Sequence, residues 1–160
     1  MQSWLDMSVS LTLEDVVLRM SLASLLGACV GWDREAQNKA AGLRTHMLVS
    51  LGSAIFTLTA LQMFQLTTVE GSARGDPTRL LQGLVAGIGF LGAGQIIQSR
   101  REVVGITTAA GIWVVGAIGV ACGGGSYVLA VLGVAFVLVI LRTIGSLERR
   151  FTAKTDARQR

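Results

Sequence analysis

The sequence has 160 residues, enough for one domain or one small helical bundle; 51% of them are hydrophobic and 15% are charged. A soluble domain carries about 25% charged residues, so this chain has too few polar side chains to cover a surface that faces water. One proline and 20 glycines argue against disorder and favour closely packed helices. We therefore expect an all-α integral membrane protein.

Five apolar runs follow one another along the chain, with charged residues between them. A helix that crosses a bilayer needs about 20 apolar residues, a length that every run except the fourth reaches. The fourth run forms either a short tilted span or, together with the fifth, a helical hairpin that enters the membrane partway. We expect a compact bundle of about five transmembrane helices over residues 1–148, ahead of a basic cytoplasmic tail over 149–160. The expected spans are 14–32, 47–66, 80–98, 107–122 and 127–147.

The basic residues lie mostly on one side of this topology. Eleven of the 14 Lys and Arg residues lie in 33–46, in 99–106 and near the C-terminus, whereas two lie on the other side and one lies in the first span. The positive-inside rule then places the N-terminus outside and the C-terminus in the cytoplasm of a bacterial inner membrane. These cations suit the anionic headgroups of the lipid bilayer. Because the tail carries a single aromatic residue, Phe151, we expect no nucleic-acid partner.

The stretch GLVAGIGFLGAGQII at 83–97 contains the spacing G-x-G-x-x-G, which wraps a dinucleotide pyrophosphate in a Rossmann domain. That fingerprint needs a preceding strand and an acidic residue about 20 positions further on. Here the stretch lies inside an uncharged run, and Trp113 stands where the acid is needed. We therefore exclude a nucleotide site and assign the stretch to the third span.

Helical geometry gives these glycines two faces. At 100° per residue, Gly83, Gly87 and Gly94 lie on one face, and Gly89 and Gly92 on roughly the opposite one. Small residues let helix backbones approach closely, which predicts a span in the middle of the bundle, with any spare glycine face available for a homodimer. The alternative is a helix that breaks near 89–94 and offers its backbone groups to an ion or ligand.

The segment 33–46, DREAQNKAAGLRTH, carries the densest polar chemistry. A favourable i,i+4 pair of Glu35 and Lys39 predicts that the first helix continues through Ala41, with Gly42 just after its end and Thr45 capping the second span. The segment is either a solvated turn or a binding site for an anion, a lipid headgroup or a partner protein. The residues predicted to gather at this cytoplasmic mouth are Asp33, Arg34, Glu35, Lys39, Arg44, Thr45 and His46.

Two kinds of ligand suit this segment. Arg34 and Arg44 suit a phosphate or carboxylate, while Asp33, Glu35 and His46 are weak candidates for a metal cation, since His46 is the chain's single histidine. No nucleophile with a base and an orienting group is present, so we expect no enzyme and no cofactor. The 99–108 loop faces the same side, with Gly105 predicted to turn the chain.

Transport is the alternative function. Ionisable residues inside spans are the usual sign of a transporter, and no Asp or Glu is predicted at mid-membrane in this chain. A carrier would instead depend on a broken third span, on Thr57 and on Gln95. Because polar groups concentrate on one face of the membrane and not along a path through it, a binding function is favoured.

Four motifs together resemble the MgtC/SapB family of bacterial inner-membrane proteins. They are RE-x₃-K-x-AGLRTH-x-LV at 34–49, GIGFLGAG at 87–94, GITTAA at 105–110, and Trp113 followed by Ile118-Gly119. The similarity covers roughly residues 15–145, and the first two motifs are specific in combination. The polar positions that match the family pattern are Arg34, Glu35, Lys39, Gly42, Arg44, Thr45 and His46.

The resemblance implies a multi-spanning protein linked to growth in low magnesium and, in intracellular pathogens, to virulence. Transport of Mg²⁺ is not an established activity of the family, and some members are thought to act on the F-type ATP synthase. Many members carry a soluble cytoplasmic domain after the last span, which this sequence of 160 residues is expected to lack.

Overall fold

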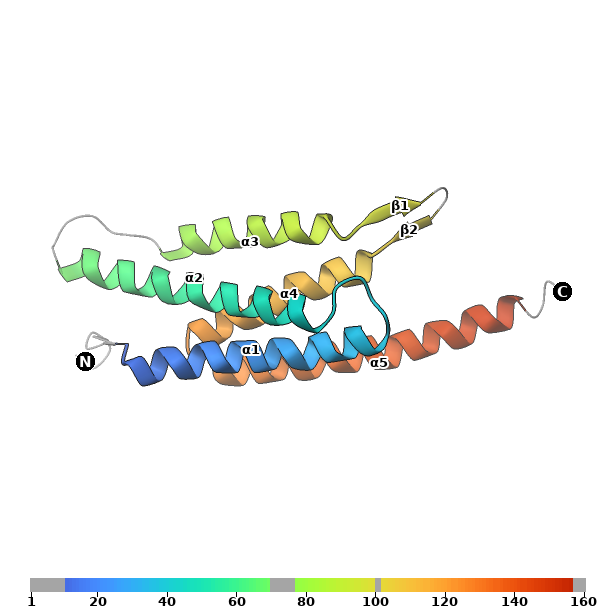
Figure 1. The fold of residues 1–160 in the computed structure, drawn as a ribbon, viewed down its shortest axis with the longest axis horizontal. Helices are drawn as coiled ribbons and strands as arrows, with labels where there is room; N and C mark the ends of the chain where they lie inside the picture. Colours follow the sequence, from blue (N-terminus) through green and yellow to red (C-terminus); the bar gives the residue numbers. More distant parts are fainter. Residues whose placement is uncertain (1–10, 70–76, 100–101, 157–160) are drawn as a thin grey trace, which may run out of the picture.

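The computed structural model describes residues 11–69, 77–99 and 102–156, which form five helices and one short hairpin (Figure 1). The helices lie close to the five predicted runs, so the helical character expected from hydropathy is confirmed. The elements are α1 (Leu13–Ala36), α2 (Leu43–Val69), α3 (Pro77–Ala93), β1 (Ile97–Ser99), β2 (Glu102–Val104), α4 (Ile106–Gly123) and α5 (Tyr127–Asp156).

Two of the described helices are long and apolar enough to cross a membrane by length and composition. These segments are Leu43–Phe64 of α2 and Ile106–Gly123 of α4. Two further apolar stretches, Thr78–Ala93 and Tyr127–Thr143, are shorter. The fourth predicted span is therefore a complete apolar helix, whereas the third is shorter than predicted.

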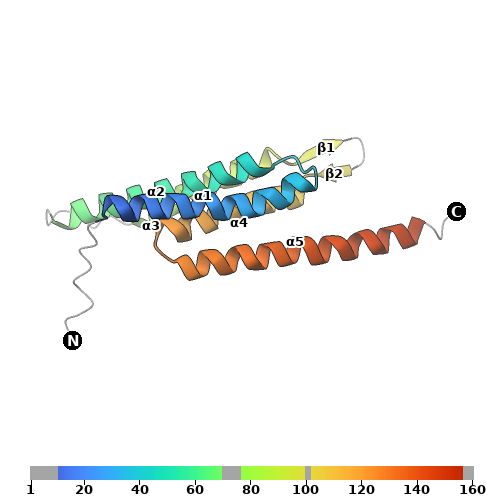
Figure 2. The ribbon, with the colours of Figure 1, turned by 60° about the horizontal axis from the view of Figure 1, so that its bottom comes forward.

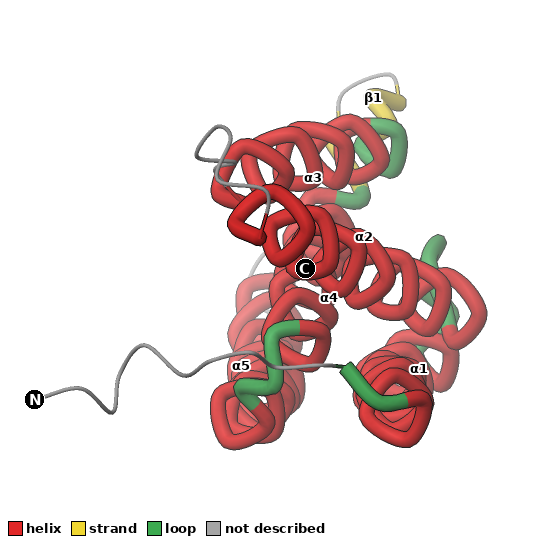
Figure 3. The backbone as a smooth tube through the Cα atoms, turned by 90° about the vertical axis from the view of Figure 1, so that its left-hand side faces the viewer, coloured by secondary structure: helices red, strands yellow, loops and turns green. Residues whose placement is uncertain are grey.

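Helix α4 occupies the centre of the bundle. It packs against α1, α2, α3 and α5, whereas α3 packs chiefly against α2 and α4. In the end-on view of Figure 3, α3 lies at one side, and α1 and α5 lie on the opposite side. The prediction that the third span occupies the middle of the bundle is therefore wrong.

Helix α3 is continuous through its first four glycines. It runs from Pro77 to Ala93 without a break, and Gly94 lies in the turn that follows. A Cβ added at Gly83, Gly87 or Gly89 would meet no atom of the described structure within 4 Å, while one at Gly92 would lie 3.4 Å from the carbonyl oxygen of Ala109. The predicted break within 89–94 is thus limited to the end of the helix, after Ala93.

Close backbone approach occurs at α2 instead. A Cβ on Gly27 of α1 would lie 2.7 Å from the carbonyl oxygen of His46, and one on Gly123 of α4 would lie 2.7 Å from that of Ala54. Gly119 of α4 is closer still, against the carbonyl oxygen of Ser50. Glycine is the residue that permits these contacts, because any side chain would push the backbones apart. The buried core beside them includes Ala23, Val30, Ala54, Val115 and Ile118.

The segment between α3 and α4 is a hairpin where the sequence predicted a simple loop. Strands β1 and β2 pair antiparallel, with Ile97 opposite Val104. Gly105 then adopts a φ of 94°, a left-handed conformation that favours glycine, and serves as the N-cap of α4. The turn predicted at Gly105 is confirmed, and the all-α description needs this short two-stranded addition.

Candidate functional site

The turn between α1 and α2 sets the geometry of the polar cluster. Helix α1 ends at Ala36, and Asn38 takes a left-handed φ of 52°, so the predicted continuation through Ala41 is wrong. The Glu35 carboxylate instead accepts a hydrogen bond of 2.7 Å from the backbone N–H of Leu43, the first residue of α2. A carboxylate at a helix N-terminus satisfies an orphan donor and suits the helix dipole. Glu35 therefore caps the second helix, the role predicted for Thr45.

A buried ion pair closes α1 at this end. The Arg34 guanidinium donates to Asp33 Oδ2 at 2.7 Å, and the two residues are 2% and 5% exposed. Gln37 Nε2 donates to the same carboxylate oxygen at 2.8 Å. From α5, Arg142 Nε reaches Asp33 Oδ1 at 3.0 Å, with an exposed side chain. One carboxylate thus ties together the end of α1 and the middle of α5.

The environment of Asp33, which directly follows the first predicted span, favours its charged form. Burial raises the pKa of this carboxyl, but hydrogen bonds and charge from Arg34 and then Arg142 outweigh burial, so the pKa lies below its ordinary value of 3.8. Asp33 is therefore an anion at neutral pH. Its charge is already matched by two guanidinium groups, which makes it a structural anchor.

His46 is fully buried, contrary to its predicted place on a polar mouth. Its Nδ1 lies 2.8 Å from the carbonyl oxygen of Gly42, to which it donates, and Nε2 points toward α4, 3.6 Å from where a Cβ on Gly111 would lie. In the described part of the chain His46 Nε2, Ser50 Oγ and Arg34 Nε are buried without a hydrogen-bond partner. His46 and Ser50 lie where α2 meets both α1 and α4.

The candidate cation ligands do not converge. Asp33 binds two arginines, Glu35 caps α2, and His46 faces the helix junction. Among the residues that the structure describes, no three His, Cys, Asp or Glu side chains form a group able to hold a metal ion. The observed arrangement gives each of these three residues a contact within the fold.

The predicted cluster therefore divides into a buried and an exposed part. Asp33, Arg34 and His46 are buried, while the side chains of Lys39 and Arg44 are exposed and Thr45 is half-buried. Sequence reasoning missed Arg142, which it counted only as a topology signal. The available signal was its position as the first charge after a long apolar run, the place where a partner from another helix is needed.

Comparison with known proteins agrees with the motifs. A model described as the MgtC family matches residues 20–150. This chain belongs to the MgtC family. It is 36% identical over 140 residues to the Escherichia coli K12 protein named "Putative magnesium transporter YhiD", a match that covers 88% of this chain and 65% of YhiD. No solved structure matches the chain.

Other relatives give the same assignment. The chain is 35% identical over 147 residues to protein MgtC of Salmonella paratyphi A, covering 90% of this chain and 60% of that protein. It is 32% identical over 126 residues to protein SapB of Bacillus subtilis, covering 78% and 54%. The chain thus spans about two thirds or less of the length of these relatives. Proteins of this family are membrane proteins, in keeping with the apolar helices described above.

Proposed function

We propose that this MgtC-type chain crosses the bacterial inner membrane five times and acts, without enzymatic chemistry, by binding a partner or ligand at its cytoplasmic end. The binding site is the cytoplasmic polar surface, which we define as the exposed side chains of Lys39, Arg44 and Arg142. The proposed role is adaptation to low magnesium and related stress. Among partners, a membrane complex such as the F-type ATP synthase is favoured by the family resemblance.

The observation that carries this proposal is the Asp33 anchor. A buried guanidinium is costly unless it is paired, and Asp33 pairs Arg34 while also holding Arg142 of α5. Through Asp33, α1 and α5 are joined at the end where the polar side chains gather. Lys39 and Arg44 then stand in solvent on a rigid base, and an arginine of this kind suits a carboxylate or phosphate on a partner.

Site-specific crosslinking tests this surface. A photoreactive amino acid at Arg44 is expected to give a discrete protein adduct in native membranes, identified by mass spectrometry. The matched control places the same probe at Leu48, one turn along α2 and 66% exposed, where lipid adducts are expected. A protein adduct at Leu48 with none at Arg44 would contradict the proposal.

Flux measurements test the competing function. The purified chain in liposomes loaded with a Mg²⁺-sensitive dye is expected to give no uptake above that of empty liposomes. Sustained Mg²⁺ uptake that depends on the protein, and that survives the change Arg44→Gln, would replace the binding proposal with transport.

A further inference from the structure

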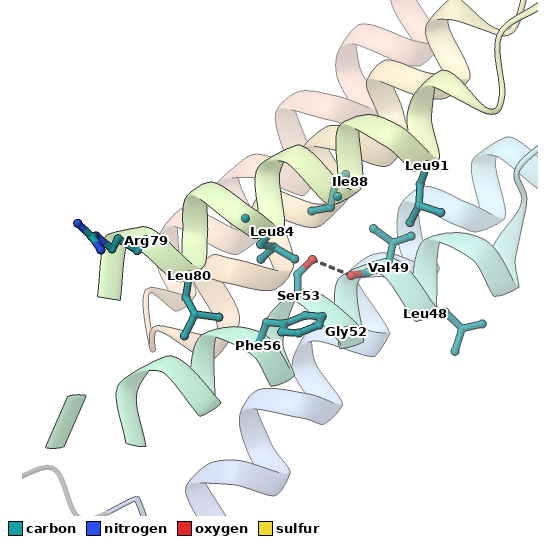
Figure 4. A pocket seen from close by; sticks show the side chains of 12 residues that line it. Leu48, Val49, Gly52, Ser53, Phe56, Arg79, Leu80, Leu84, Ile88 and Leu91 are labelled. Atoms are coloured by element: carbon teal, nitrogen blue, oxygen red, sulfur yellow. Dashed lines mark hydrogen bonds between the residues drawn. The ribbon is translucent and has the colours of Figure 1, made fainter. Parts of the chain in front are cut away.

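An apolar groove runs between α2 and α3. Its volume is about 740 Å³. Figure 4 shows that Phe56 and Val49 of α2 lie opposite Leu84 and Ile88 of α3 across this space. The residues that line it include Gly52, Phe56, Arg79, Gly83, Leu84 and Gly87.

Three glycines keep this groove open. A Cβ built on Gly52, Gly83 or Gly87 would find no atom of the described structure within 4 Å. The hydroxyl of Ser53, which Figure 4 shows between the two helices, donates to the carbonyl oxygen of Val49 at 2.8 Å. Its hydrogen-bond demand is therefore met within α2. The groove is therefore lined by apolar side chains and by glycines that leave room for a ligand.

The length of the groove matches one leaflet. From Arg79 to Leu91 helix α3 rises about 18 Å at 1.5 Å per residue. The hydrocarbon core of a bilayer is about 30 Å thick, so one leaflet is about 15 Å. A transmembrane helix from a neighbour would run the full thickness, whereas an acyl chain runs through one leaflet.

The charge at the end of the groove selects a phosphate. Arg79 is exposed and lies where α3 begins, at the end opposite Leu91. Both ion pairs among the described residues lie around Asp33, and Arg79 takes part in neither. A guanidinium binds phosphate through directed hydrogen bonds.

From these features we infer that the groove between α2 and α3 is a phospholipid site. One acyl chain lies along Gly83 and Gly87, and Arg79 holds the phosphate. The inference rests on the proposed membrane embedding of α2 and α3 but not on the partner proposed for the cytoplasmic polar surface. A second copy of the chain, the homodimer expected from sequence, is the competing occupant.

Native mass spectrometry of the protein purified in mild detergent tests the site. With added phosphatidylglycerol, the wild-type chain is expected to retain one lipid per monomer. Gly87→Leu, and independently Gly52→Leu from the opposite wall, fill the groove and are expected to lower bound lipid about tenfold, which corresponds to about 1.4 kcal/mol. The matched control is Ala86→Leu, an exposed position on α3 outside the groove.

Arg79→Gln tests the contact with the lipid headgroup separately from the contact with the acyl chain. It is expected to lower retention of phosphatidylglycerol about fivefold, the effect of about 1 kcal/mol for an arginine near a charged lipid surface. Equal lipid retention in Gly87→Leu, Gly52→Leu and Ala86→Leu would overturn the site. A wild-type dimer that Gly87→Leu and Gly52→Leu, but not Ala86→Leu, convert to monomers would assign the groove to a second copy. Neither result affects the crosslinking at Arg44, so the two proposals fail separately.

Discussion

Two faces of helix α2 differ in how closely the glycines of neighbouring helices approach them. Toward α1 and α4, glycines let backbones meet, as at Gly27 and Gly119, and polar groups such as His46 are sealed in the contact. Toward α3, Gly83 and Gly87 meet nothing and leave a groove. A glycine in a membrane helix therefore indicates close helix packing only where another helix lies against it. At Gly83 and Gly87 of α3, glycine instead marks open space.

The largest effect is expected at the buried end of the tight face. Asp33→Asn leaves the Arg34 guanidinium, 2% exposed, without its counter-charge. Breaking such a buried pair destabilises a protein by about 3 kcal/mol. Thermal unfolding of the detergent-solubilised protein is expected to show this loss, with Glu14→Gln, at an exposed side chain of α1, as the comparison. An unchanged melting temperature would show that Arg34 finds another partner.

A single methyl group distinguishes the two faces. Gly119→Ala places a Cβ against the carbonyl oxygen of Ser50, so the backbones of α2 and α4 must separate. We expect a loss of about 1–3 kcal/mol, the usual effect of overpacking. The readout is the same thermal unfolding measurement. A gain in stability at Gly119 would contradict the close contact of α2 with α4.

The same change on the open face is expected to have the opposite sign. Gly83→Ala meets no neighbour and replaces glycine by the strongest helix former. The expected gain is up to about 1 kcal/mol. Measured side by side, Gly83→Ala and Gly119→Ala compare one substitution in two environments, and a loss at Gly83 would show that α3 packs there against something beyond this chain.

The contribution of Asp33 to the tight face is also expected to depend on pH. Because its pKa in the folded protein is lowered from 3.8, the ionised carboxylate contributes stability that is fully present above pH 3.8 and is lost as the pH falls through the lower folded value. Melting temperatures of the wild type and Asp33→Asn are therefore expected to converge only below pH 3.8. Convergence at higher pH would mean that the carboxylate is not held by the arginines.

Hydropathy predicts the helices well, because each needs only a long apolar run. Their neighbours are harder to predict. A helical wheel places Gly83 and Gly87 on one face but does not show which helix, if any, packs against that face. For this reason the sequence wrongly predicts that α3 lies in the middle of the bundle. The family motifs were recognisable from residues 34–49 and 87–94, since they depend on order along the chain alone.

The polar segment shows the same limit. The sequence predicts which residues form this segment but not which of them are buried. The burial of His46 depends on glycines of α1 and α4, which a local pattern in the segment does not include. Glu35 was paired with Lys39 on a helix that ends before Lys39. The bond from Arg142 to Asp33 joins residues 109 positions apart, and a local pattern carries no information about such a contact.

The length of α5 gives the Asp33 contact a further meaning. Tyr127–Asp156 is a helix of 30 residues, and it extends past the other helices in Figure 2. About 21 Å of this helix lies beyond Arg142. The bond between Arg142 and Asp33 lies where this extension of α5 begins. This projecting part of α5 is therefore tied, through a single exposed arginine, to the carboxylate that neutralises the buried Arg34.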